Sequence, residues 1–476
     1  MIISKEEGRT GSLLDRDEEK SLPDQVTEQA ARGPRTLKGQ QITPRKRLIA
    51  ASILSLMCFA TTFSSSAYAS SALSIEKHFQ ASQDVVLLGV ALFVLGSALG
   101  PLLFGPLSFV IGKRPVYIIT FLSFTAFSFG AAESRNIETL IILRFLAGAC
   151  GSSALNNVPA SLTDMLELHQ LNSFMMFYAL GSTAGSGLAP VVMGFVDHYA
   201  GWRWNLRVQA ILIACSTIAC ILFVPETADL DIQERSDTTQ RKVDRLYQSF
   251  CSFCTAMKRS LGRPFAWLFT EPVVTVICLY ISLLYGVLYA TFEAVPFVFL
   301  GLRHWTAQST GLFFLSLFIG FLVGGALIVI LQGRYYKSLQ KANIPILPEA
   351  RFRQALWGSL LPPIGILIFA WTAPFPHVHW IVPAIGMFLF SAGMLIIFTS
   401  LLPYVSLYAG QEAPMAMAAT TFTRCAFGCF FPLVTIRMLE RMTTQGACSF
   451  LAGVSLLLVP VPFFLNAKGA YLREKH

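Results

Sequence analysis

The chain has 476 residues, of which 54% are hydrophobic and 13% are charged, and its formal net charge is +9. Soluble domains carry about 25% charged residues, so this composition excludes a soluble globular protein, a disordered chain and a disulfide-stapled secreted domain. We therefore expect an integral membrane protein. Basic residues beside anionic lipid are usual in such proteins, so the net charge does not indicate nucleic-acid binding.

Stretches of about 20 predominantly apolar residues, the length that crosses a bilayer as a helix, occur twelve times along the chain. The pattern predicts an all-α integral membrane protein with twelve transmembrane helices. The spans expected in the first half are 48–72, 85–109, 115–132, 139–163, 172–196 and 206–224. Those expected in the second half are 271–300, 309–332, 354–373, 380–402, 414–434 and 446–465.

Polar segments divide these spans into two groups of six. Residues 1–47 are rich in charge and poor in aromatics, which predicts a disordered cytoplasmic tail. Residues 225–270 are predicted to be a cytoplasmic linker between an N-terminal bundle, 48–224, and a C-terminal bundle, 271–466; residues 467–476 are predicted to form a second short cytoplasmic tail. Two six-span halves around a linker are typical of secondary transporters built from repeats.

The basic residues predict the orientation of the spans. With the N-terminus inside, 27 of the 36 Lys and Arg residues fall in cytoplasmic segments and 7 fall in outer loops. The positive-inside rule therefore predicts that both termini are cytoplasmic.

Motifs of other function classes are missing from the sequence. There is no Gly-x-x-x-x-Gly-Lys-(Ser/Thr) loop, so we do not expect an ATP-driven pump. Cys251 and Cys254 form a lone Cys-x-x-Cys without the second ligand pair of a zinc site, and we expect no metal and no cofactor. The sequence has no His-Glu-x-x-His motif or His/Asp cluster, so we do not expect an enzyme. The polar tail and linker are too short for a sensor domain.

The loop between the second and third spans carries a glycine and basic motif. It reads Gly-Pro-Leu-Ser-Phe-Val-Ile-Gly-Lys-Arg-Pro over residues 105–115. It resembles the loop signature of the major facilitator superfamily, Gly-x-Leu-x-(Asp/Glu)-x-x-Gly-(Arg/Lys)-(Arg/Lys), although Phe109 replaces the acidic residue. An ordinary basic turn is the alternative. The resemblance implies a cytoplasmic gate loop that contains Gly105, Gly112, Lys113 and Arg114.

Two further motifs lie inside spans. Span four contains Arg144-x-x-x-Gly148, similar to the family's span-four motif. A charge in hydrocarbon costs at least about 2.5 kcal/mol, so Arg144 is expected to face a cavity or a partner; the alternative is that it snorkels to the surface. Span five resembles the family's antiporter signature, which favours export, although generic helix packing is the alternative. The residues of that antiporter-type helix are Gly181, Gly185, Pro190 and Gly194.

Shorter motifs resemble the fungal branch of the twelve-span drug:proton antiporter family. They include Pro225-Glu226-Thr227, Phe292-Glu293-Ala294-Val295-Pro296 and Phe422-Thr423-Arg424. The resemblance covers roughly residues 45–476. It implies the major facilitator fold of two six-helix bundles, export of a small organic compound, and a monomer.

Three charges lie deep within the predicted spans: Arg144, Glu293 and Arg424. An ionisable group inside a membrane is by default a functional hypothesis. Glu293 is the only carboxylate among them, so it is the candidate proton carrier if transport is proton-coupled. The alternative is a structural ion pair or hydrogen bond near the outer end of the span.

Spans one and seven are expected to line the cavity between the halves. Their hydroxyls and aromatic faces suit a moderately hydrophobic, oxygen-bearing organic molecule. The alternative for each of these residues is ordinary packing. The predicted cavity residues are Thr62, Ser65, Tyr68, Tyr285, Tyr289 and Phe292.

Together these observations predict a secondary active transporter that exports a drug, toxin or fungal secondary metabolite by proton antiport. Uptake or facilitated diffusion of a metabolite such as a polyamine or organic acid is the alternative. The expected partners are the lipid bilayer, a small-molecule substrate and protons. We expect the plasma membrane, with the vacuolar membrane as the alternative.

Overall fold

The structure is a computed structural model that describes residues 44–165, 168–226, 262, 265–341, 352–409 and 413–474. Most of the predicted tail 1–47 and most of the predicted linker 225–270 lie outside these residues. Several stretches inside helices, among them residues 109–110, are described in their backbone only, so the predicted effect of Phe109 on the gate loop falls outside what the structure describes.

The first half consists of long helices that match the six predicted spans. The first span continues through a short 3-10 turn, η1, into α3. The second ends only at Ile111, so Gly105 lies inside a helix rather than in the predicted loop. The helices are α2 (Pro44–Ala67), η1 (Tyr68–Ser71), α3 (Ala72–Phe79), α4 (Gln83–Ile111), α5 (Lys113–Ala132), α6 (Ile137–Met165), α7 (Leu168–Ala200) and α8 (Trp202–Phe223).

The second half repeats this pattern, with several spans divided into two helical pieces. Proline begins α11 and lies near the start of α15, where its missing N–H costs no helical hydrogen bond. The elements are α11 (Pro272–Pro296), η2 (Phe297–Leu302), α12 (Ala307–Phe313), α13 (Leu315–Lys341), α14 (Phe352–Gly358), α15 (Leu361–Thr372), α16 (Ile381–Tyr408), α17 (Ala413–Leu458) and α18 (Pro460–Glu474).

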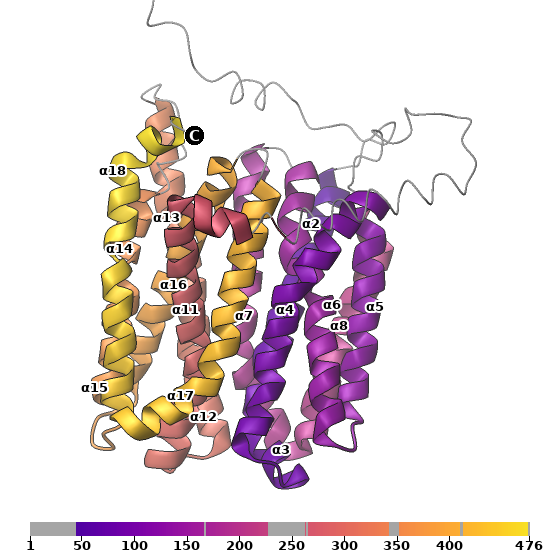
Figure 1. Ribbon diagram of the computed structural model, residues 1–476, viewed down its shortest axis with the longest axis vertical. Helices are drawn as coiled ribbons and strands as arrows, with labels where there is room; N and C mark the ends of the chain where they lie inside the picture. The colour runs from indigo at the N-terminus through magenta and orange to yellow at the C-terminus, as the bar shows by residue number, and fades with distance from the viewer. Residues whose placement is uncertain are drawn as a thin grey trace, which may run out of the picture.

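Eleven segments of the described chain are long and apolar enough to cross a membrane. The last, Met415–Ala467, has 53 residues, about 80 Å of helix, far more than one crossing needs. Its helical backbone is broken at Thr443, inside α17, where φ is 61°, and Figure 1 shows the chain reversing direction within α17 before it continues into α18. The segment therefore contains both predicted spans 414–434 and 446–465, and the predicted fold class is confirmed.

The helices form two halves that stand side by side, with α2–α8 in one and α11–α18 in the other (Figure 1). The N-terminal end of α2 and the C-terminal end of α18 lie at the same end of the bundle, which we call the terminal end; α3 and α12 lie at the opposite end. Helix α18 continues to Glu474, so most of the segment predicted as a C-terminal tail is helical. Outward side chains such as Ile119, Leu122 and Ile218 are more than half exposed, as expected for a surface that faces lipid.

The halves meet along two seams. Helix α4 packs against α17, and α7 packs against α12 and α13. Two of the glycines predicted for the antiporter-type helix allow close contacts on different faces of α7, one with α2 in the same half and one with α12 in the other half. A Cβ on Gly181 would lie 2.8 Å from the carbonyl oxygen of Ser55 on α2, whereas a Cβ on Gly194 would lie 3.5 Å from the Cα of Gly311 on α12. Small residues thus let α7 approach both halves.

Arg303 closes the opposite end of the second half. It follows η2, and its guanidinium donates four hydrogen bonds to the carbonyls of Thr372, Ala373, Phe375 and Val378, at 2.7–3.0 Å. These carbonyls belong to the C-terminal end of α15 and the loop after it, which have no helical donors. Burial lowers the pKa of Arg303 from its usual value. Arg303 is therefore a structural cap for this end of α15.

The tightest contact within the first half joins α4 to α6. A Cβ on Gly148 would overlap the backbone carbonyl of Phe93, and Ser97 donates a 3.1 Å hydrogen bond to the carbonyl of Gly148. Because the obstacle is backbone, no side-chain rotation can relieve it. The glycine is therefore required for this helix spacing.

We predict that Gly148→Ala destabilises the protein by about 1–3 kcal/mol, the usual cost of overpacking. Thermal unfolding in detergent, followed with a thiol-reactive dye, measures the effect. Gly453→Ala is the matched control because no atom lies within 4 Å of its Cβ position. Equal melting temperatures for the two variants would contradict the prediction.

Candidate functional site

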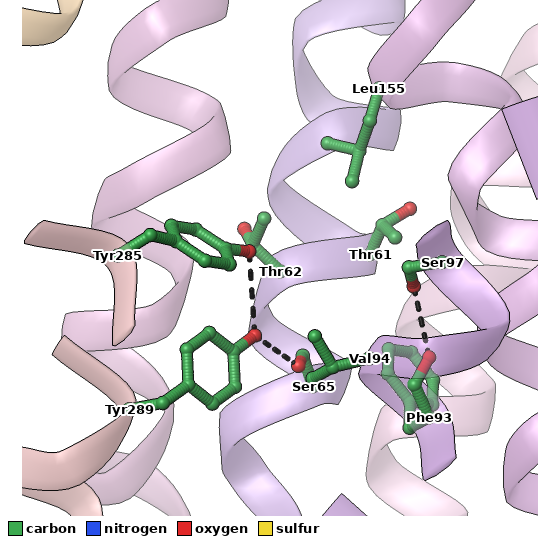
Figure 2. Close-up of a pocket in the computed structure, with 9 residues that line it drawn as sticks. All are labelled: Thr61, Thr62, Ser65, Phe93, Val94, Ser97, Leu155, Tyr285 and Tyr289. Carbon is green, nitrogen blue, oxygen red and sulfur yellow. Dashed lines mark hydrogen bonds between the residues drawn. The ribbon is translucent and has the colours of Figure 1, made fainter. Parts of the chain in front are cut away.

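A small cavity lies inside the bundle where the two halves meet. Its floor and walls come from α2, α4 and α6 of the first half and from α11 of the second (Figure 2). It has room for about one water, so the halves are closed on each other. The lining residues are Thr61, Thr62, Ser65, Phe93, Val94, Ser97, Leu155, Tyr285 and Tyr289.

A chain of hydroxyl groups crosses from one half to the other in this cavity. The hydroxyls of Ser65 on α2 and Tyr289 on α11 are 2.5 Å apart, and the hydroxyls of Tyr289 and Tyr285 are 3.5 Å apart. Figure 2 shows the two tyrosines stacked along α11 with their hydroxyls turned toward α2. Because the tyrosines are four residues apart, they share one face of the helix.

Arg144 holds the first-half wall of the cavity together. Its guanidinium is 2% exposed and donates to the carbonyls of Gly89 on α4 and of Ser64 and Ser65 on α2, at 3.0–3.4 Å. The rings of Tyr68 and Phe93 flank it, with centroids 4.8 and 4.4 Å from Cζ. Arg144 therefore faces partners inside the bundle and does not snorkel.

The motif Arg144-x-x-x-Gly148 now has a physical explanation. Gly148 brings α6 against the backbone of α4 at Phe93, and one turn away along both helices Arg144 reaches the carbonyl of Gly89. Gly148 sets the distance between α6 and α4, and Arg144 donates a hydrogen bond from α6 to α4 at that distance. The four-residue interval follows from one helical turn.

The other two buried charges lie in the second half and are less well satisfied. Glu293, 7% exposed on α11, has a buried Oε1 without a hydrogen-bond partner, and it makes no ion pair with a described residue. Arg424, 6% exposed on α17, has an unpartnered Nε, and its guanidinium lies against the rings of Tyr285 and Phe398. An unpaired buried charge is costly, so both are candidates for function.

The structure brings four of the six predicted cavity residues together. Thr62, Ser65, Tyr285 and Tyr289 line the cavity, whereas Tyr68 stacks on Arg144 and Phe292 packs between Tyr289 and Phe314. The contribution of α4 was not predicted because apolar residues predominate around most of that helix and no periodicity marks an inner face. The lining residues outside the predicted set are Thr61 on α2, Phe93, Val94 and Ser97 on α4, and Leu155 on α6.

The predicted gate loop is a single residue, Gly112, whose φ of 93° favours glycine. The Glu226 carboxylate accepts hydrogen bonds from the backbone N–H groups of Lys113 and Arg114, at 3.0 and 3.1 Å. A carboxylate at a helix N-terminus is stabilising, so Glu226 caps α5. Lys113 is 7% exposed, so this end of the helix is packed against α8.

At the opposite end, a second contact joins the halves. Arg437 on α17 and Asp84 on α4 form an ion pair with Nη2 and Oδ2 2.6 Å apart, and both side chains are more than half exposed. Exposed pairs of this kind contribute about 0–1 kcal/mol. Sequence reasoning missed the pair because the two residues are 353 positions apart.

No group of three or more His, Cys, Asp or Glu side chains in the described part of the chain could hold a metal ion. The cavity itself is lined by hydroxyl groups, aromatic rings and aliphatic side chains.

Two helical bundles that enclose a polar cavity at their contact form the architecture of a secondary transporter. The chain belongs to the Major Facilitator Superfamily, because the model of that family matches residues 53–432. The family predicted from the motifs is thereby confirmed, and the protein is a multi-pass membrane protein.

Curated relatives are fungal transporters. The chain is 37% identical over 451 residues to Efflux pump FUBT of Fusarium oxysporum, which covers 93% of this chain and 76% of that protein. It is 35% identical over 419 residues to Major facilitator superfamily multidrug transporter mdrA of Aspergillus fumigatus, covering 86% and 69%. It is 30% identical over 440 residues to Major facilitator superfamily multidrug transporter FLU1 of Candida albicans, covering 90% and 72%.

We predict that Arg144→Gln lowers stability by about 1–3 kcal/mol, because it removes the charge-assisted hydrogen bonds that tie α6 to carbonyls on α2 and α4. Arg207→Gln is the control, since it removes an equal charge from an ion pair with Glu133 whose side chains are 31% and 59% exposed; about 1 kcal/mol or less is expected there. Thermal unfolding in detergent distinguishes them. A variant Arg144→Gln as stable as the control would contradict the role given to Arg144.

Proposed function

We propose that the protein exports a small organic compound across the membrane by alternating exposure of the central cavity. The observation that carries this proposal is the hydroxyl- and aromatic-lined cavity at the contact of the two halves, crossed by the Ser65–Tyr289 hydrogen bond. The printed names of the relatives, efflux pump and multidrug transporter, support outward movement of the substrate. The terminal end then faces the cytoplasm, as the basic residues predict.

The closed cavity determines what a transport cycle requires. Drug-sized ligands occupy about 300–1,000 Å³, far more than the space present, so the halves have to separate before substrate enters. When the halves separate on the cytoplasmic side, the hydrogen bond between Ser65 and Tyr289 breaks and the cavity opens toward the cytoplasm. Separation on the other side breaks the Asp84–Arg437 pair. A substrate with its own oxygen atoms can replace the lost Ser65 and Tyr289 hydrogen bonds.

Proton entry drives this export, and Glu293 carries the proton. Glu293 lies one helical turn beyond Tyr289 on α11, so it is on the face of the helix that Tyr285 and Tyr289 present to the cavity. Its buried Oε1 has no partner among the described residues. A carboxylate without a partner is costly when buried, so closure favours the protonated form and opening to water favours release.

Glu293→Gln mimics the protonated carboxyl permanently, so we expect it to abolish proton-coupled export while leaving folding unchanged. The measurement is accumulation of labelled drugs, metabolites and organic acids in cells that express the protein, with and without a protonophore. Wild-type expression is expected to lower accumulation of at least one compound, and the protonophore should restore it. ATP-free proteoliposomes with an imposed pH gradient should show the same transport.

Glu440→Gln is the matched control, since Glu440 is an exposed carboxylate on α17; it should export like wild type. Export by Glu293→Gln that still responds to the protonophore would remove Glu293 from the coupling mechanism. Raised accumulation in wild-type cells would replace export by uptake or facilitated diffusion.

A further inference from the structure

Arg424 is a cation for which the described structure supplies no counterion. Its side chain is 6% exposed, its Nε has no hydrogen-bond partner, and it forms no ion pair with a described residue. Arg144, buried to the same degree, donates to three backbone carbonyls. The difference matters because a buried guanidinium is stable only when its donors are satisfied.

The neighbours of Arg424 are two aromatic faces and the thiol of Cys425, with which it shares a side-chain hydrogen bond. Its Cζ lies 5.1 Å from the ring centroid of Tyr285 and 5.6 Å from that of Phe398. One turn further along α17, Gly428 leaves room for the Tyr285 ring, since a Cβ there would lie 3.1 Å from it. Tyr285 itself lines the central cavity, so the guanidinium contacts a ring of the cavity wall.

The lining of the cavity has the electrostatic character that suits an anion. Six of its side chains carry hydroxyl groups, three are apolar, and none is acidic. The two buried guanidinium groups lie in opposite halves, Arg144 in α6 and Arg424 in α17. Glu293, the buried carboxyl proposed to carry the proton, is not part of this lining. A carboxylate substrate can accept two parallel hydrogen bonds from one guanidinium.

We infer that Arg424 is the anion-recognising residue of the central cavity and that the substrate is an organic acid with a planar, apolar body. When the halves separate and the Tyr285 ring turns aside, the carboxylate pairs with Arg424. The planar body then packs against Tyr285, Tyr289 and Phe398, and the hydroxyl of Ser65 is free to bond to the substrate. The inference rests on the proposed export function for its setting and deepens it by naming the substrate class.

The test uses purified full-length protein in detergent and three probes with the same ring and different charge: 2-naphthoate, 2-naphthamide and 2-naphthylmethylamine. Binding is measured by calorimetry and by the shift in melting temperature at pH 7.5. Wild-type protein should bind the acid at least tenfold tighter than the amide and the amine. Equal or tighter binding of the amide or the amine overturns the inference, as does failure to bind any acid in a series from benzoate to pyrenebutyrate.

Variants assign this preference to one residue. Arg424→Gln should lose the tenfold preference for the acid, whereas Arg441→Gln, which removes an exposed arginine from the same helix, should keep it. If Arg424→Gln does not fold, Arg424→Lys replaces it in the test. Lysine keeps the positive charge but lacks the paired N–H donors of arginine, so the preference for the acid over the amide should fall at least threefold. An unchanged preference in the folded Arg424 variant overturns the assignment.

Binding and export fail separately in this design. Export of neutral drugs by a protein with no acid preference would leave the proposed function standing and overturn the inference. Acid preference in the binding measurement without any export in cells would support the inference and overturn the proposed function.

Discussion

The position of the central cavity depends on one buried guanidinium. In a bilayer every polar group has to be satisfied within the protein, and Arg144 meets this requirement by binding carbonyls on two other helices, α2 and α4. Helices whose carbonyls share one donor cannot shift independently. The hydroxyl of Ser65 is therefore held at a defined place, because the carbonyl of the same residue accepts one of the Arg144 hydrogen bonds. Tyr289 in the other half then finds its partner at 2.5 Å.

Glycine packing and the guanidinium support each other in this wall. Gly148 allows the backbones of α6 and α4 to touch, and without that spacing Arg144 could not reach Gly89. Among the described residues of the second half, Arg424 makes no corresponding set of hydrogen bonds to the carbonyls of neighbouring helices. It lies against Tyr285 and Phe398 with an unpartnered Nε. The two halves thus contribute different elements to the cavity: a fully bonded wall on one side, and unsatisfied charges, Arg424 and Glu293, on the other.

Hydropathy predicted the membrane helices well because lipid contact and helix length are properties of single segments. It misplaced the start of α2 at Pro44 and the ends of α4 at Ile111 and α18 at Glu474. Helices α2 and α18 extend into polar sequence beyond their apolar stretches. Four cavity residues on α2 and α11 were predicted, since their hydroxyls stand out in apolar spans. Phe93 and Val94 could not be predicted, because apolar residues surround most of α4 and do not distinguish the face that points into the protein. The Glu226 cap and the Asp84–Arg437 pair join residues more than a hundred positions apart, and only tertiary packing brings them together.

The two seams between the halves differ in what holds them. Along α7 the contact with α12 is made by glycines and backbone, where a Cβ on Gly311 would lie 2.9 Å from the carbonyl of Pro190. Along α4 and α17 the halves are joined by side chains, and the ion pair at the opposite end is exposed and weak. Side-chain contacts can break and re-form with modest cost, whereas backbone contacts can separate only if whole helices move. A Cβ on Gly428 of α17 would lie 3.2 Å from the side chain of Val94, which lines the cavity, so the side-chain contacts of the seam between α4 and α17 adjoin the cavity directly.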